Sequence, residues 1–257
     1  MEESIFARRK ELEACNKGDH AGLLLDRYLL KLNDPDSRQN LQQMAIKAIS
    51  ATSALYRIAF ERHQKLCVEM YKHHCRKEIE TRDSSRLIIG LGNASVLETG
   101  LTLHHTYGTP LIPGSALKGL CAHHASELLL ERQPELLSKT QYNFIFGDTK
   151  NSGHIIFHDA WIVPKFLSES LKLDVMTPHH TDYYSQNGAS APTDFDSPTP
   201  VSFLSVSGVF EIILSSASGN DEGWLDVVWV ILKDALEARG IGGKTSSGYG
   251  RMMAFKN

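Results

Sequence analysis

The chain has 257 residues, of which 42% are hydrophobic and 22% charged, so it can bury one sizeable core, as one domain or one domain with large additions. Its formal net charge of -3 excludes the global positive field that drives indiscriminate nucleic-acid binding. It lacks both a run of about 18 apolar residues and the apolar stretch of a signal peptide. We therefore expect a soluble, cytoplasmic protein. The four cysteines form no CxxC pair, which argues against a zinc ribbon and a disulfide framework.

Helical periodicity dominates the first third of the chain. Apolar residues recur at helical spacing from Ser4 to about Leu32 and from Leu41 to about Lys77, which predicts two helical segments. The run NDPDS at 33–37 predicts a polar turn with a proline stop between them. We expect residues 1–82 to form a helical N-terminal extension.

The pattern changes after Asp83. The aliphatic run at 86–92 predicts a buried strand, and Ser115 is a reasonable N-cap for the helical pattern that follows it. Further strands are predicted at 153–163, 171–176, 201–214 and 249–255, and a helix is predicted from about Glu222 to Ala238. The polar segment 177–200 predicts a long functional loop.

From Arg86 onward these elements give the order of a ferredoxin-like (RRM-like) βαββαβ unit. We therefore predict an α+β fold. In it, residues 83–257 form a ferredoxin-like core with an insertion at about 171–200.

A glycine-rich run, GIGGKTSSGYGR at 240–251, is the strongest functional signal. Glycines such as Gly242 and Gly243 lack the Cβ atom that would block close approach, so their N–H groups can form an anion-binding concavity. Lys244 and Arg251 supply charge, and phosphate is the natural guest. The hydroxyls of Thr245, Ser246 and Ser247 supply donors, and the ring of Tyr249 offers a surface on which a base could stack.

Two other interpretations of this run are possible. A nucleotide-binding P-loop requires glycine five residues before Gly243, where Ala238 stands, and a strand–loop–helix context instead of the expected helix–loop–strand. The P-loop is therefore excluded. A flexible connection whose glycines only satisfy turn geometry stays open.

Histidines raise the question of a metal or nuclease site. His179, His180 and Asp182 have the best spacing, but a metal needs at least three convergent ligands. We expect no metal and no cofactor. Acid–base cleavage of RNA by His104 or His179 with Lys244 stays an alternative. Aromatic residues of the long loop could stack on bases or anchor the loop on the core: Tyr183, Tyr184 and Phe195.

Several segments resemble the RAMP superfamily of CRISPR proteins. They are IPGSALKG at 112–119, FGD at 146–148 with GHIIFHDA at 153–160, and the glycine-rich run before the last strand. The segments LDVMTPHHTDYY at 173–184 and DSPTPV at 196–201 are narrower and resemble the sixth-subunit family of the Cmr (type III-B) effector complex. The resemblance spans residues 86–255 and leaves out the N-terminal helices.

The resemblance implies a subunit without catalytic activity that binds guide RNA (crRNA) near its 3′ end, the guide–target RNA duplex and neighbouring Cmr/RAMP subunits. It departs from the family where Ala122 and His123 stand in place of a basic residue after the Lys-Gly pair. We expect RNA contacts from the following residues: Ser115, Lys118, His179, His180, Gly242, Gly243, Lys244, Thr245, Ser246, Ser247, Tyr249 and Arg251. The alternatives are an endoribonuclease of the same fold and a nucleotide-binding enzyme.

Overall fold

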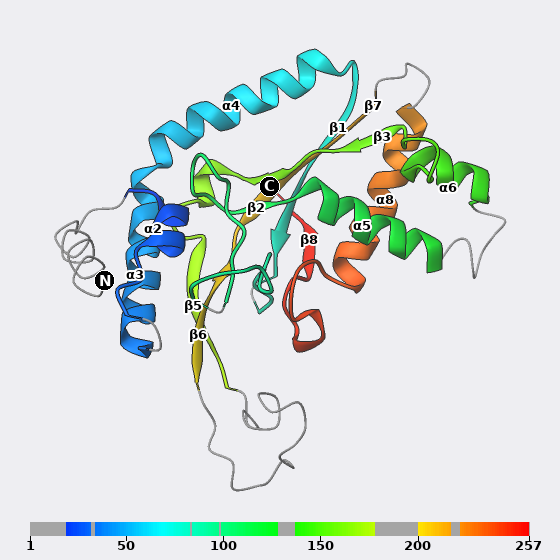
Figure 1. The fold of residues 1–257 in the computed structure, drawn as a ribbon. Coiled ribbons are helices and arrows are strands. Elements are labelled where there is room, and N and C mark those ends of the chain that lie inside the picture. Colours follow the sequence, from blue (N-terminus) through cyan, green and yellow to red (C-terminus); the bar gives the residue numbers. More distant parts are fainter. Residues whose placement is uncertain are drawn as a thin grey trace, which may run out of the picture.

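The computed structural model describes residues 19–31, 34–82, 84–97, 99–127, 137–177, 200–216 and 222–256. The fold is α+β, as expected: a six-stranded sheet and a separate two-stranded sheet are surrounded by helices (Figure 1). The helices are α2 (Ala21–Arg27), α3 (Pro35–Ala51), α4 (Ser53–Met70), α5 (Gly114–Ala125), α6 (Lys139–Phe146) and α8 (Glu222–Ala238), with short 3₁₀ helices η2 (Pro164–Phe166) and η3 (Thr245–Ser247). Within the described ranges, every helix is too short or too polar to cross a bilayer.

The six-stranded sheet is antiparallel, in the order β2-β4-β7-β1-β8, and β3 also pairs with β7. Strands β5 and β6 form the second sheet. The strands are β1 (His73–Thr81), β2 (Leu111–Ile112), β3 (Ile155–Phe157), β4 (Ala160–Ile162), β5 (Leu171–Met176), β6 (Val201–Val206), β7 (Val209–Ser216) and β8 (Met252–Ala254).

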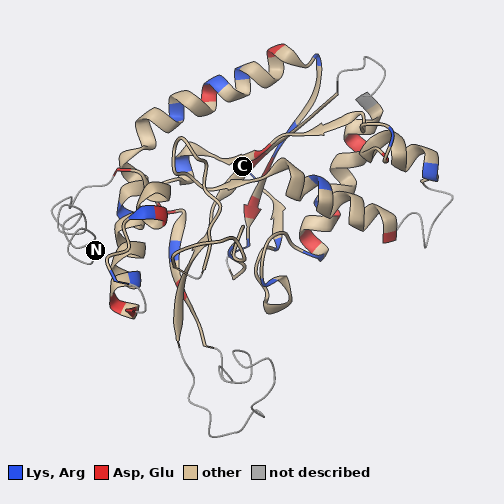
Figure 2. Cartoon of the chain, viewed as in Figure 1, with Lys and Arg blue, Asp and Glu red and all other residues tan. Residues whose placement is uncertain are grey.

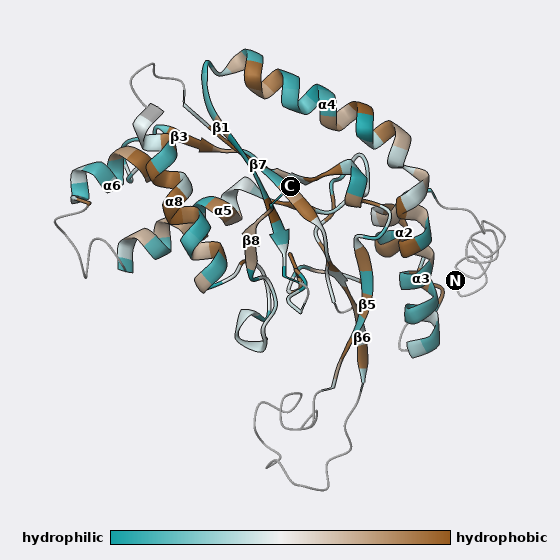
Figure 3. Ribbon diagram, turned by 180° about the vertical axis from the view of Figure 1, so that it is seen from behind, coloured by the Kyte–Doolittle hydropathy of each residue, from teal (hydrophilic) through white to brown (hydrophobic). Residues whose placement is uncertain are grey.

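The core lies on the face of the sheet that α8 covers. Phe210, Ile212 and Leu214 alternate along β7 and are fully buried, and each contributes about 1.5–3 kcal/mol through burial. Helix α8 contacts β1, β7 and β8, and α5 packs along α8. The buried residues of α8 are Leu225, Val228, Ile231, Leu232, Ala235 and Leu236, and the α8 ribbon includes much of the hydrophobic colour in Figure 3. On the opposite face lies α4, whose Gln64 reaches Glu211 of β7.

Strand β1 corrects the predicted extent of the N-terminal helices. The helix expected to reach Lys77 ends at Met70, and His73–Thr81 is a strand between β7 and β8. Its sequence, HHCRKEIET, has one fully buried residue, Ile79, so pairing with two neighbours, rather than its own pattern, makes it a strand. It is an interior strand of the sheet although it precedes residue 83.

The run at 86–92 is not the predicted strand. Leu87, Ile88 and Ile89 are buried as expected, but the segment forms one isolated bridge, between Leu87 and Val206. Most of its backbone partners belong to irregular segments: Gly243 and Gly250 donate to it, and Ile89 accepts from Thr102.

Other predicted element boundaries differ less from the structure. The predicted strand at 201–214 is two strands, β6 and β7, separated at Gly208, where φ is +140°. Pro35 begins α3 instead of stopping a helix, because its fixed φ suits the first helical turn. Helix α8 and strand β5 have the predicted bounds, and the strand at 153–163 is β3 and β4. Residues 1–18, in the first predicted helix, and 178–199, in the predicted loop, lie outside the described residues.

Candidate functional site: the glycine loop and the start of helix α5

The glycine loop, residues 240–251, connects the end of α8 to β8 and contains the helix η3. Positive φ angles at Gly240, Gly242, Gly248 and Gly250 explain four of its glycines. Lys244 is the one described non-glycine residue with a positive φ, +57°. A lysine in this disfavoured conformation is held by its surroundings.

The loop is docked on the buried run at 86–92. The N–H of Gly243 donates to the carbonyl of Ile88 (2.7 Å), and the N–H of Gly250 donates to that of Arg86 (2.8 Å). A Cβ atom on Gly242 would lie 2.2 Å from the Ile88 carbonyl oxygen. The glycines therefore do satisfy turn geometry, as one of the two interpretations held, and the loop is docked by backbone hydrogen bonds.

This docking also limits the predicted anion cradle. The N–H groups of Ile241, Gly243 and Gly250 are used within the protein. Among the described residues, the N–H groups of Lys244, Thr245 and Ser246 have no hydrogen-bond partner. The hydroxyl-bearing turn is accessible, since Lys244 and Thr245 are half-buried and Ser246 and Ser247 are exposed. The part of the loop that can receive a phosphate is thus 244–247.

Tyr249 fixes the loop to the β5–β6 hairpin. Its hydroxyl donates to Asp174 of β5 (3.2 Å), and its ring packs edge-on against Phe203 of β6. Asp174 also pairs with Arg86 (3.0 Å) and accepts from Ser205 (2.6 Å). Burial and the nearby Asp174 carboxylate raise the pKa of Tyr249. These contacts give Tyr249 a structural role, and they connect the loop to the strands that flank residues 178–199.

A second group of predicted residues lies at the start of α5. Ser115 is exposed, Lys118 is half-buried, and both line a shallow cavity of about 390 Å³ beside Asp148. Helix α5 begins at Gly114, after Pro113, so Ser115 is not its N-cap. A side chain from another element takes that role.

That side chain is Asp159, whose Oδ1 accepts the Gly114 N–H (2.7 Å). A Cβ atom on Gly114 would lie 2.1 Å from the Phe157 carbonyl oxygen. The two sequence segments that resemble the RAMP superfamily, 112–119 and 153–160, therefore meet here. The carboxylate already satisfies the positive end of α5, so Lys118 is the remaining positive charge for an anion in this cavity.

No cavity or hydrogen bond between described residues joins these two groups, and His179 and His180 lie outside the described residues. The structure therefore brings Gly242–Ser247, Tyr249 and Arg251 together, and separately Ser115 and Lys118. Figure 2 shows Lys and Arg interspersed with Asp and Glu over the helices and strands. Any RNA surface must depend on local groups.

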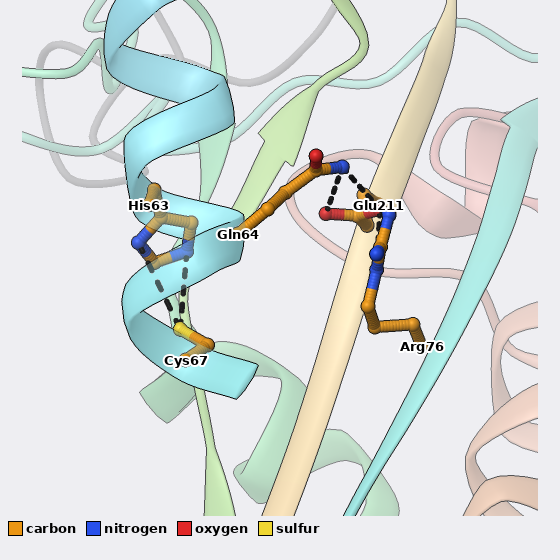
Figure 4. Close-up of polar contacts among 5 residues, drawn as sticks. All are labelled: His63, Gln64, Cys67, Arg76 and Glu211. Atoms are coloured by element: carbon orange, nitrogen blue, oxygen red, sulfur yellow. Dashed lines mark hydrogen bonds and ion pairs between the residues drawn. The ribbon is translucent and has the colours of Figure 1, made fainter. Parts of the chain in front are cut away.

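Sequence reasoning missed the polar contacts that organise the framework. Glu211 of β7 is 3% exposed and accepts from Gln64 (2.9 and 2.8 Å) and from Arg76 of β1 (2.6 Å). Figure 4 shows both side chains converging on this carboxylate, with His63 and Cys67 adjacent on α4. A single charged residue within the apolar run of β7, VFEIIL, is the signal that could have revealed it.

A second missed cluster supports the glycine loop. Buried His124 of α5 accepts from Arg239 Nε at its Nδ1 (2.8 Å), so its Nε2 carries the hydrogen and donates to Asp234 (2.6 Å). Arg239 also pairs with Glu127 and directly precedes Gly240. The end of α8 is therefore anchored to α5 where the loop begins.

The described histidines form no metal site. His63 stacks on Trp161 with ring centroids 4.4 Å apart, and His104 meets the same ring edge-on. Among the described residues, no three His, Cys, Asp or Glu side chains are placed to hold a metal ion. His104 and Lys244 share no contact or cavity in the described part of the chain.

Comparison with known proteins identifies the class. The family model of the RAMP superfamily matches residues 84–253, and the chain belongs to this superfamily. It is similar to the CRISPR system Cmr subunit Cmr6 of Pyrococcus furiosus, with 29% identity over 227 residues, covering 68% of this chain and 66% of that relative. The chain thus spans just under two thirds of that relative's length.

One solved structure shares the fold. A chain in the cryo-EM structure of the type III-B Cmr-beta bound to cognate target RNA aligns with 99% of this chain and 74% of its own length, at a TM-score of 0.60 and 19% identity. The crystal structure of Cmr6 from Pyrococcus furiosus aligns over 71% of this chain and 98% of that one, at 29% identity and a TM-score of 0.45.

Proposed function

We propose that this chain is a non-catalytic, RNA-binding and assembly subunit of a type III-B CRISPR effector complex that acts in the cytoplasm. Membership of the RAMP superfamily and similarity to a Cmr6 subunit support this proposal. The observation that carries it is the docked glycine loop, which presents Lys244, Thr245 and Ser246 on a fixed backbone. Fixed N–H and cationic groups grip phosphates without reading bases, as a subunit serving any guide sequence requires.

The proposal includes a ferredoxin-like core that differs from the predicted one in its first strand. With β3 and β4 taken as one interrupted strand, the order β1, α5, β3/β4, β7, α8, β8 gives the βαββαβ unit. The sheet order β4-β7-β1-β8 agrees with it. In this arrangement α2, α3 and α4 form the N-terminal helical extension, and the glycine loop precedes the last strand of the unit.

The test is RNA binding by the double variant Lys244→Ala, Arg251→Ala. We expect affinity for guide RNA to fall about tenfold or more. The slope of log affinity against log salt should fall by about 1.4, which is about 0.7 for each phosphate of a single strand that the variant no longer neutralises. The matched control is Lys165→Ala, Lys256→Ala, which removes the same charge from exposed positions outside the loop. Equal weakening in the two double variants would contradict the proposed site.

The absence of catalysis has its own experiment. The purified chain is incubated with labelled guide precursor and with target RNA, with and without a divalent metal. We expect both RNAs to stay intact. Cleavage that disappears in His179→Ala or Lys244→Ala would instead identify an endoribonuclease.

A further inference from the structure

Helix α4 exposes a row of large apolar side chains to solvent. It runs along the outside of the molecule (Figure 1), and four of its side chains are 48–69% exposed: Leu55, Ile58, Leu66 and Met70. Arg62 completes the row, because steps of three or four residues return to the same side of a helix. We call these five residues the α4 stripe. Single exposed apolar residues are common, but a contiguous apolar row indicates a surface that another segment covers.

The first described residues of the chain lie beside this stripe. Arg62 donates to the Tyr107 hydroxyl (3.2 Å), so the stripe lies on the side of α4 that faces the loop containing Tyr107. A ring nitrogen of His20 contacts the carbonyl of His105 in the same loop (3.1 Å). The residues that precede Asp19 therefore start close to the middle of the stripe.

These preceding residues have the sequence pattern of a separate helix. Apolar residues recur at helical spacing in the segment 4–17, and three of them share one side: Ile5, Leu12 and Cys15. His20 has an extended backbone as the N-cap of α2, so a helix in this segment has to end before it. Gly18 is a suitable stop signal.

The length and the point of attachment select the segment 4–17 as the occupant of the stripe. A helix of these residues is about 21 Å long, and the distance along α4 from Ile58 to Met70 is about 18 Å. The segment joins α2 near the middle of the stripe. An antiparallel direction carries it toward Met70, whereas a parallel direction leaves the stripe at Leu55 within one turn.

Charge agrees with the antiparallel direction. If Cys15 lies beside Ile58, then Glu11 lies beside Arg62, because the members of each pair are four residues apart on the two helices. The one cation of the stripe then meets a carboxylate. A second copy of α4, paired with the first about the centre of the stripe, would instead bring two Arg62 side chains together.

We propose that residues 4–17 form a helix that packs antiparallel against the α4 stripe, with Ile5, Leu12 and Cys15 on its aliphatic side chains and Glu11 paired with Arg62. Removal of these apolar side chains from water provides the free energy of docking. The stripe is thus covered from within the chain and does not bind a neighbouring molecule. The inference is independent of RNA binding.

The main test measures hydrogen–deuterium exchange of the amides at 5–15 in the full chain. Leu66→Asp places a charge on the stripe, and we expect the exchange rate of these amides to rise about tenfold or more. The matched control is Val68→Asp, a similar change at an exposed position on the opposite side of α4. Wild-type amides that exchange without protection, or equal effects of the two variants, would overturn the proposal.

Disulfide trapping tests the contact directly. Upon oxidation of the full chain, Ile58→Cys should form a disulfide with Cys15 in the same molecule, because cysteines whose Cα atoms lie within about 7 Å can be bridged. Arg57→Cys, an exposed position that faces away from the stripe, should not. Peptide mapping by mass spectrometry detects both links. The absence of a link between position 58 and Cys15 contradicts the proposal, and a link between two molecules contradicts it in favour of a second copy.

Discussion

Three half-buried histidines surround the contact between α4 and the sheet. His63 and His104 pack on Trp161, and His158 contacts Ser215 at 2.7 Å. Burial lowers the pKa of each below the ordinary value of 6.5, and the nearby Asp159 carboxylate only partly opposes this. The folded protein therefore holds these rings neutral at a pH where the unfolded chain would protonate them.

This gives a pH prediction for stability. Because the unfolded state binds more protons, the free energy of unfolding should be constant above about pH 6.5 and decrease as the pH falls below it. Each ring contributes at most about 1.4 kcal/mol per pH unit. Urea unfolding between pH 7.5 and 5.5 measures the slope, and His63→Phe with His104→Phe should flatten it. The control is exposed His105→Phe, and equal flattening by that variant would contradict the assignment.

For individual residues, the sequence predicted which positions matter better than it predicted which residues they contact. Four glycines of GIGGKTSSGYGR have positive φ, as the alternative based on turn geometry required, while the predicted anion binding stays a prediction. The sequence did not indicate that Tyr249 is engaged by Asp174, because that contact joins positions 75 residues apart. Base stacking by Tyr249 and RNA contacts by His179 and His180 stay predictions.

The glycine loop behaves as a rigid element despite its composition. Gly250 and Gly248 both have positive φ, +77° and +92°, but their surroundings differ. A Cβ atom on Gly250 would lie 2.0 Å from the Ile241 carbonyl oxygen, whereas nothing lies within 4 Å of one on Gly248. Alanine variants at these two positions therefore separate the free-energy cost of the backbone conformation from the free-energy cost of close packing.

We expect Gly248→Ala to lower the free energy of unfolding by about 1–2 kcal/mol, the cost of a left-handed residue. Gly250→Ala should cost about 3 kcal/mol or more, because the backbone must also move away from Ile241. Equilibrium urea unfolding of the two variants measures the difference. Similar decreases would mean that the loop can shift, and that its docking does not constrain it.

Among the elements, those with strong hydrophobic periodicity were predicted correctly, whereas a strand that depends on pairing with its neighbours was not. The amphipathic pattern of 222–238 predicted α8, and the bounds of β5 were correct. Strand β1 was missed because its sequence is mostly polar, with a single fully buried residue. The run at 86–92 was predicted as a strand because buried strands are typically runs of apolar residues. A buried irregular segment has the same apolar pattern, so the sequence does not distinguish the two.

For the molecule as a whole, the two faces of the large sheet differ in chemistry. The face under α8 is apolar, while the face toward α4 has Glu78 directly opposite Glu211. Cross-strand partners point to the same face, so two carboxylates lie side by side beside Arg76. We expect these carboxylates to repel an RNA strand from the face toward α4. This sheet would then differ from sheets that stack bases on an open face.

Glu78→Gln tests this. We expect guide RNA affinity equal to that of Glu61→Gln, an exposed control on α4 with the same charge change, because both positions lie outside the RNA site proposed in the glycine loop. Removing the like-charge pair should also raise the free energy of unfolding by about 0.2–1 kcal/mol. Filter binding and urea unfolding provide the two measurements. A tenfold difference in affinity between the variants would place RNA on the sheet.

The position of β1 also determines when the sheet can form during synthesis. Its neighbours β7 and β8 are both translated later, β7 more than a hundred residues after Thr81. At roughly 5–20 residues per second, a nascent chain holds this strand without partners for on the order of ten seconds. Its charged residues Arg76, Lys77, Glu78 and Glu80 keep it soluble in that interval. A sequence that does not favour a strand is therefore suited to an interior strand whose pairing partners are translated later.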